Sequence, residues 1–241
     1  MMNKKWIRVT GIVFTLFVIT FWYFNAPSIL NTALLKVKPK ILGAFTDPNR
    51  GYASITNYYI FYGIPFLFLV RYLAADENYS YIMRTHNRKK IMKNRIRIIL
   101  LFSLIFVTVH LFVLTMGAHI FIGPEYLEMI HFNQSLAAQG INNWLFYIIM
   151  AILYYLVSDI VNSKEKGIFL LIIGYFLFFE GSNLVFNLNN ILEGSILYPM
   201  MMNQYDGLSY LLLLLKQILI AASVFYVSVT IFERKDILNE T

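Results

Sequence analysis

The chain of 241 residues carries a formal net charge of +7, and 59% of its residues are hydrophobic while only 14% are charged. With a mean hydropathy of +0.62, this composition lies outside the range of soluble domains and predicts a membrane protein. The sequence contains no cysteine, which excludes disulfides, thiol catalysis and cysteine-ligated zinc.

Six apolar stretches follow one another along the chain, and each is long enough to cross a bilayer because about 20 helical residues cover roughly 30 Å of hydrocarbon. They are residues 6–24, 56–75, 98–118, 144–162, 168–187 and 209–232. The loops between them are too short to bury cores of their own. The sequence therefore predicts an all-α integral membrane fold in which residues 1–241 form a single domain of six transmembrane helices.

The distribution of basic residues predicts the orientation of these helices. The first stretch follows a start with two lysines and has no small-x-small cleavage site, which favours an uncleaved helix with a cytoplasmic N-terminus. Alternation then places 15 Lys and Arg residues in cytoplasmic segments and 4 in external ones. Because positive side chains are retained in the cytoplasm, both termini are expected there. The charge is explained by topology and by membrane lipids, so we expect no nucleic acid partner.

The external segment at residues 119–142 contains a helix-start signal. Gly123-Pro124 is followed by Glu125 and Glu128, and carboxylates are favoured in the first turn of a helix. We therefore expect a short helix to begin there.

The motifs of the common enzyme classes are missing from the sequence. There is no phosphate-binding loop, no nucleophile elbow and no zinc-protease pair. The histidines are not spaced as metal ligands on one helical face; they are His86, His110, His119 and His131. For His110, inside the third stretch, a hydrogen bond between packed helices is favoured over a ligand or proton site. We expect no catalytic residue, cofactor or metal site in this chain.

Two charged residues lie well inside apolar stretches, where an ionised side chain costs about 2.5–3.5 kcal/mol. Glu180 and Lys216 each lie roughly 10 Å from the external end of the predicted helix, at 1.5 Å per residue. We expect the two to pair, with the lining of a substrate path or outward snorkelling of Lys216 as alternatives. Asp159, near the cytoplasmic end of the fourth stretch, is expected to be solvated.

The most basic segment is the predicted cytoplasmic loop at residues 76–97, which contains Tyr81-Ile-Met-Arg-Thr-His-Asn-Arg-Lys-Lys90. The positive-inside preference explains its charge but not a length of about 22 residues. Such a segment can form a short surface helix that docks a soluble partner. This loop is the best candidate for an interaction site.

The run at residues 81–90 resembles the cytoplasmic coupling segment of small bacterial ABC-2-type ABC transporter permeases, especially those of peptide or bacteriocin export and immunity. Phe232-Glu-Arg-Lys-Asp236, directly after the last stretch, is similar to their usual ending. Six helices with both termini inside fit the same family. The chain departs from many members because only five residues precede the first stretch, which leaves no room for their amphipathic helix along the inner membrane face.

The resemblance implies a permease subunit in a bacterial plasma membrane that moves a hydrophobic or amphipathic compound outward, such as an antimicrobial peptide. It further implies a second permease copy and separate ABC ATPase subunits, which would hold ATP and Mg. On the matching positions, the ATPase-docking loop would consist of Tyr81, Arg84, His86, Asn87, Arg88, Lys89 and Lys90.

Two other functions stay open at this point. The main alternative is a stand-alone membrane immunity or sensor protein that binds a peptide through its external segments without transport. The membrane-embedded binding component of a vitamin importer has a comparable size, but the long basic loop and the lack of an evident polar pocket weaken that interpretation.

Overall fold

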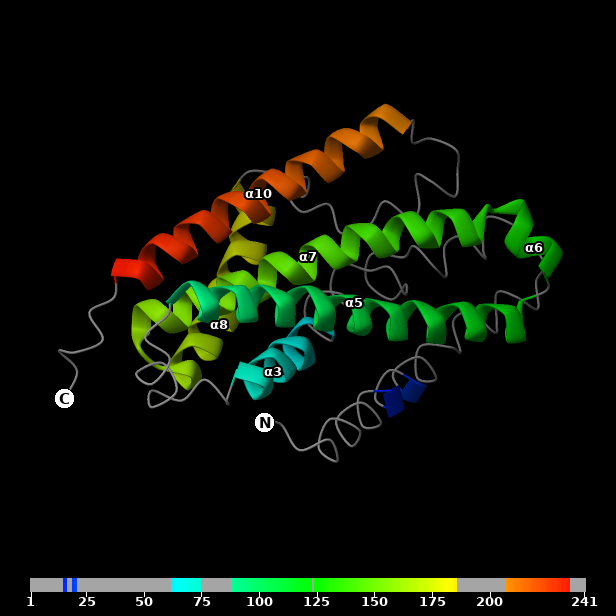
Figure 1. Ribbon diagram of the computed structural model, residues 1–241. Coiled ribbons are helices and arrows are strands. Elements are labelled where there is room, and N and C mark those ends of the chain that lie inside the picture. The colour runs from blue at the N-terminus through cyan, green and yellow to red at the C-terminus, as the bar shows by residue number, and fades with distance from the viewer. Residues whose placement is uncertain are drawn as a thin grey trace. The chain divides into compact units, whose positions relative to one another are not determined.

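The computed structural model describes residues 15–16, 19–20, 62–74, 88–122, 124–185 and 207–234, and the regular structure of these residues is helical (Figure 1). The helices are α3 (Gly63–Ala74), α5 (Arg88–Phe121), α6 (Pro124–Met129), α7 (Phe132–Val161), α8 (Lys164–Val185) and α10 (Gly207–Arg234).

Three of these helices, α5, α7 and α10, are long and apolar enough to cross a membrane. The candidate spans in these helices are 33, 30 and 28 residues long. At 1.5 Å per residue, even the shortest extends about 42 Å, more than the hydrocarbon core. The described part of the chain is thus all-helical, and its three candidate spanning helices indicate a multi-pass membrane protein.

The helices overlap five of the six predicted stretches. The candidate spanning helices contain residues 98–118 and 209–232 and all of 144–162 except its last residue. The helices α3 and α8 overlap 56–75 and 168–187. Most of residues 6–24 lie outside the described residues. Six membrane crossings therefore stay a prediction.

Two helices begin well before their apolar stretches, by ten residues or more. α5 starts at Arg88 instead of residue 98, and α7 starts at Phe132 instead of residue 144. Polar and basic side chains lower the hydropathy there, but Lys, Arg, Met and Gln are good helix formers, so the backbone continues as a helix. The predicted short helix is confirmed as α6, with Glu125 in its first turn.

The chain divides into two compact units. Unit 1 comprises Met1–Tyr62, Ile105–Trp144 and Gly194–Leu213, and unit 2 comprises Gly63–Leu104, Leu145–Glu193 and Leu214–Thr241. The described core of unit 1 is formed by apolar residues of α5, α6 and α7, for example Leu114, Leu127 and Phe132. Each long helix contributes residues to both units.

Unit 2 has an aromatic core between α3 and α7. The rings of Phe66 and Tyr147 lie 4.7 Å apart between centroids, within the range of favourable aromatic contacts. Both side chains are buried, as are Leu67 and Tyr154. This packing fixes the face that α7 presents to the core of unit 2.

The turn between α7 and α8 has local determinants in the sequence. Asn162 adopts a left-handed φ of 57°, which Asn tolerates better than most residues and which ends α7. Ser163 then caps α8, because the Lys166 backbone N–H donates to its Oγ at 3.2 Å. A two-residue connection therefore reverses the chain.

The three long helices differ in how much they bury. Of the most apolar window of α7, 61% is buried inside the protein, compared with 33% for α5 and 17% for α10. α10 exposes leucines along much of its length, including Leu208, Leu212, Leu215 and Leu219. α7 is thus the main core-forming helix, while α10 leaves most of its apolar surface for lipid or another chain.

Candidate functional site

The basic beginning of α5 has two faces. Ile91, Met92 and Arg95 are buried, and Arg88 is half-buried, whereas Lys89, Lys93 and Arg97 are exposed. Positions three and four residues apart share one side of a helix. The six cations between Arg88 and Arg97 are therefore divided between an inward set, Arg88 and Arg95, and an outward set that also includes the exposed Lys90.

Arg95 forms a buried ion pair with Asp159 of α7. Its Nη1 donates to Asp159 Oδ2 at 2.6 Å and its Nη2 to Oδ1 at 3.3 Å. The side chain of Arg95 is only 4% exposed and that of Asp159 only 10%. This two-point contact satisfies both carboxylate oxygens and fixes the relative orientation of the two groups.

Two aromatic rings complete the environment of the Arg95 guanidinium. Its central carbon lies 4.7 Å from the ring centroid of Tyr155 and 4.4 Å from that of Phe232. Both distances lie within the range of cation–π attraction. Since Tyr155 belongs to α7 and Phe232 to α10, one side chain of α5 contacts both of the other candidate spanning helices within unit 2.

The prediction that Asp159 is solvated is wrong, because its side chain is only 10% exposed and is paired with Arg95. Because α5 continues as a helix to Arg88, Arg95 lies on its inward face opposite α7. The carboxylate is therefore enclosed with an arginine and two rings. The predicted stretch begins at residue 98 and does not include Arg95, so the sequence pattern does not indicate this partner for Asp159.

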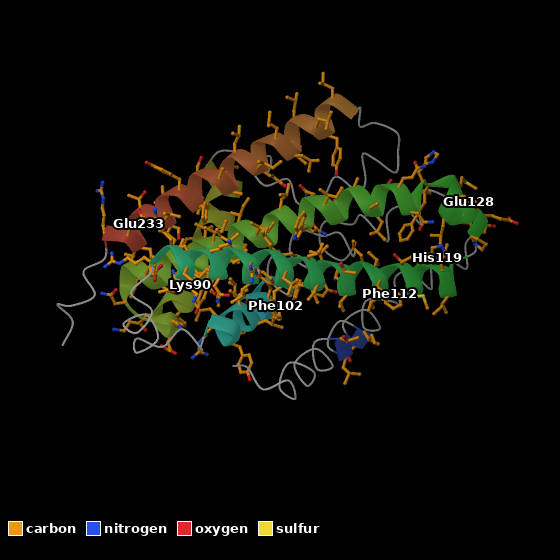
Figure 2. The ribbon with its side chains drawn as sticks, viewed as in Figure 1. Lys90, Phe102, Phe112, His119, Glu128 and Glu233 are labelled. Carbon is orange, nitrogen blue, oxygen red and sulfur yellow. The ribbon has the colours of Figure 1, made fainter. Side chains whose placement is uncertain are left out.

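Arg88 holds the carboxyl end of α10. Its Nη1 donates to the backbone oxygen of Glu233 and, at 3.5 Å, to that of Phe232. The last carbonyl groups of a helix lack partners inside it and carry partial negative charge, so a guanidinium is favourable there. Figure 2 labels Lys90 and Glu233 at these neighbouring helix ends. Beneath the contact, Phe232 packs with Ile91 and Met92.

A second ion pair joins α3 and α8. Arg71 Nη2 donates to Glu165 Oε1 at 2.8 Å, and both side chains are exposed, by 37% and 69%. The hydrogen bond from Arg71 is the main reason why the pKa of Glu165 lies below its ordinary value. Because solvent screening weakens such a surface pair, it contributes little to the packing of α3 against α8.

α7 and α8 approach closely at Gly167. A Cβ atom at this position would lie 2.8 Å from the Ser158 Cα. Only glycine allows the two backbones to come so near. This contact leaves the amino-terminal part of α8 against α7, four residues after the cap at Ser163.

The described residues of unit 1 bury a row of neutral polar groups. Ser135, Gln139, Asn142 and Asn143 of α7 are each at most 3% exposed. Gln139 Nε2 donates to Asn143 Oδ1 at 2.9 Å. The sequence interpretation missed this row, because residues up to 142 were assigned to an external segment. The sequence feature that indicates this row is the helical spacing of Ser135, Gln139 and Asn142.

His110 is also buried in unit 1. It is 4% exposed, and its ring meets that of Tyr62 edge to face, with centroids 4.4 Å apart. An aromatic contact therefore accounts for part of its environment. His119, at the other end of α5, is exposed, and its Nδ1 lies 2.9 Å from the Thr115 carbonyl oxygen; Figure 2 labels it on α5.

Most of the predicted docking loop lies outside the described residues. Tyr81, Arg84, His86 and Asn87 belong to that part, and Arg88, Lys89 and Lys90 form the first turn of α5. Arg88 faces α10, whereas the other two are exposed. Docking by these residues stays a prediction.

The predicted intramembrane pair is likewise untested. Glu180 belongs to α8, but the placement of its side chain lies outside what the structure describes. Lys216 is exposed on α10. Their pairing and their lining of a path stay predictions.

Within the described ranges, no group of three or more His, Asp or Glu side chains is arranged to hold a metal ion. Comparison of the chain with protein-family models, with curated proteins and with solved structures found no match.

Proposed function

We propose that the chain is the permease subunit of an ATP-driven exporter in a bacterial plasma membrane. It moves a hydrophobic or amphipathic compound, such as an antimicrobial peptide, outward. It works with a second permease copy and with ABC ATPase subunits that hold ATP and magnesium. The main support is the linkage of the basic segment to α7 and α10 through Arg95 and Arg88.

A coupling segment has to transmit a displacement, and the first turns of α5 have the contacts for that task. A partner that pushes on residues 81–90 acts directly at the first turn of α5. Separating Arg95 from Asp159 would leave a buried charge without its partner, which is strongly unfavourable. The contacting ends of α5, α7 and α10 therefore move together more easily than they separate.

The proposed transport step follows from this linkage. Closure of the ATPase dimer displaces the docking loop, and α5 carries the displacement to α7 through Asp159 and to the end of α10 through the contact with Arg88. The tilt of these helices then opens the substrate path outward. Glu180 and Lys216 are the proposed polar residues of that path or its structural ion pair.

Purification of the tagged full-length chain in mild detergent tests the proposal. Mass spectrometry and an ATPase assay would identify a retained ATP-binding subunit. We expect wild type to retain it and Arg84→Glu/Lys89→Glu to lose it. Arg88 is left intact because its contact with α10 is structural, and Glu in place of Lys89 is compatible with a first helical turn.

A matched control reverses two exposed cations elsewhere, Lys166 and Arg234. Lys166→Glu/Arg234→Glu should retain the ATPase if docking uses the loop. If wild type and both double variants retain the ATPase, docking through Arg84 and Lys89 is refuted, but the proposal of a permease is not. No ATPase with any form would refute the permease and favour a stand-alone immunity or sensor protein.

A further inference from the structure

The outward face of the beginning of α5 carries a row of three cations, Lys89, Lys93 and Arg97, spaced by four residues. All three side chains are exposed. In the part of the chain that the structure describes, no hydrogen bond or ion pair is recorded for them. The first turn of α5 also contains no acidic residue. The row therefore presents positive charge that the surrounding described residues do not neutralise.

The same face becomes apolar one turn later. Leu101 is 53% exposed and Leu104 48% exposed, and Leu101 continues the four-residue spacing of the cations. On a candidate membrane-spanning helix, exposed leucines contact lipid chains. The change from charge to leucine then marks the edge of the hydrocarbon core between Arg97 and Leu101.

Helix geometry relates the cations to the lipid layers. Arg97 lies about 6 Å along the axis from Leu101, and Lys93 about 6 Å further, at 1.5 Å per residue. The polar head-group layer on each side of the core is about 5–7 Å thick. Long basic side chains can incline toward it while their stems cover apolar surface. Arg97 and Lys93 thus reach the level of the lipid phosphates. The backbone of Lys89 lies about 18 Å from Leu101, outside this layer, and only its long side chain can incline toward it.

We propose that Lys89, Lys93 and Arg97 form a binding surface for the head group of an anionic phospholipid, whose chains lie along Leu101 and Leu104. The charge of the row matches a phosphate, and the adjoining leucines match acyl chains. A soluble protein covers the cations but does not reach the leucines without entering the bilayer. This surface is separate from the inward contacts of Arg88 and Arg95, and it does not require the chain to be a permease.

Native mass spectrometry of the full-length chain, titrated with phosphatidylglycerol or phosphatidylcholine, tests this surface. Wild type should bind phosphatidylglycerol more tightly. Each cation near a lipid surface contributes about fivefold in affinity. Lys93→Gln/Arg97→Gln should therefore weaken phosphatidylglycerol binding by about 10- to 30-fold and leave phosphatidylcholine binding unchanged. Lys89 is kept because it also belongs to the proposed docking loop.

Two controls test whether a lower net charge or a loss of the folded structure, instead of loss of this binding surface, explains weaker phosphatidylglycerol binding. Lys166→Gln/Arg234→Gln removes two exposed cations outside the row and should retain the preference. Lys93→Arg/Arg97→Lys, which conserves charge, should retain it as well. Loss of preference in the first control to the same extent would overturn the proposal, because net charge would then explain binding.

Three further outcomes would also overturn it. One is equal binding of both lipids by wild type. Another is displacement of phosphatidylglycerol by soluble glycerol phosphate at equal concentration, since the apolar contacts would then contribute nothing. The third is an unchanged lipid preference in Lys93→Gln/Arg97→Gln together with loss of a retained ATPase subunit, which would assign the row to a protein partner.

Discussion

Among the described residues, both units bury neutral polar groups, for example Gln217 in unit 2, but the buried ion pair belongs to unit 2. Unit 2 encloses a full ion pair, Arg95 with Asp159, between aromatic rings. Unit 1 encloses neutral amides, with Gln139 bonded to Asn143. A charge that loses its partner in a medium of low dielectric constant is far less stable than an amide that loses one hydrogen bond. Breaking the Arg95–Asp159 pair of unit 2 should therefore cost much more than breaking the Gln139–Asn143 hydrogen bond of unit 1.

The largest difference between the units should appear when the ion pair is broken. Asp159→Leu leaves Arg95 charged and buried, and we expect it to destabilise the protein by about 3–5 kcal/mol. Arg95→Met/Asp159→Leu removes both charges and should recover most of that loss. Unfolding in mixed detergent micelles, followed by circular dichroism, measures both variants. Equal destabilisation of the single and double variants would contradict the isolated-charge explanation.

Close helix contacts give the next largest effect. Gly167→Ala brings a Cβ within 2.8 Å of the Ser158 Cα, and because backbone atoms cannot move aside cheaply we expect a loss of about 1–3 kcal/mol. Gly140→Ala in unit 1 meets the flexible side chain of Leu111 and should cost less. Gly174→Ala meets no atom within 4 Å and should stabilise α8 by up to about 1 kcal/mol.

The order of these three glycine variants is the test, and thermal unfolding in one detergent gives it. A Gly140→Ala variant less stable than Gly167→Ala would show that unit 1 is the more rigid of the two at its helix contacts.

The buried amides should give a smaller effect than the ion pair. Gln139→Leu removes the donor to Asn143 Oδ1, and we expect a loss of about 1 kcal/mol, because hydrogen bonds between membrane helices contribute modestly. Asn143→Leu should cost less, since it also removes a buried Nδ2 to which the described structure gives no hydrogen-bond partner. Detergent unfolding compares the two variants. A loss as large as that of Asp159→Leu would remove the contrast between the units.

The smallest effect belongs to the exposed pair in unit 2. The pKa of Glu165 is lowered by the hydrogen bond from Arg71, so the pair stabilises the folded state above the ordinary pKa of 4.5. That contribution is lost as the pH falls through the lower folded-state pKa. Thermal unfolding of wild type and Glu165→Gln between pH 3 and about 7 measures it. We expect the curves to converge at low pH; a constant gap would refute a charge effect.

Hydropathy was sufficient to predict the candidate spanning helices, because a long apolar run has few alternatives to a helix in a membrane protein. The start of α6 was also predictable, since Pro124 and Glu125 are local signals. Asp159 was mispredicted for a different reason. Its partner lies 64 residues away, and the contact depends on how far α5 extends and how it is rotated. The start of the apolar stretch at residue 98 indicates neither the first residue of α5 nor the rotation of the helix about its axis.

The row of buried amides in unit 1 illustrates the same difficulty. Gln139 and Asn142 are polar enough to be assigned to an external loop, and their helical spacing becomes informative only when a helix is assumed. The exposed cations of α5 were recognised as basic, but their separation from Arg88 and Arg95 required the helical register.

The 64 residues between Arg95 and Asp159 also have a consequence for biosynthesis. A chain elongated at about 5–20 residues per second presents Arg95 roughly 3–13 s before its carboxylate partner. During that interval α5 has a guanidinium on its inward face and no α7 to receive it. Water or lipid head groups have to solvate that charge until α7 arrives. Final placement of α5 therefore waits for α7, and the two helices enter the finished fold as one cooperative step.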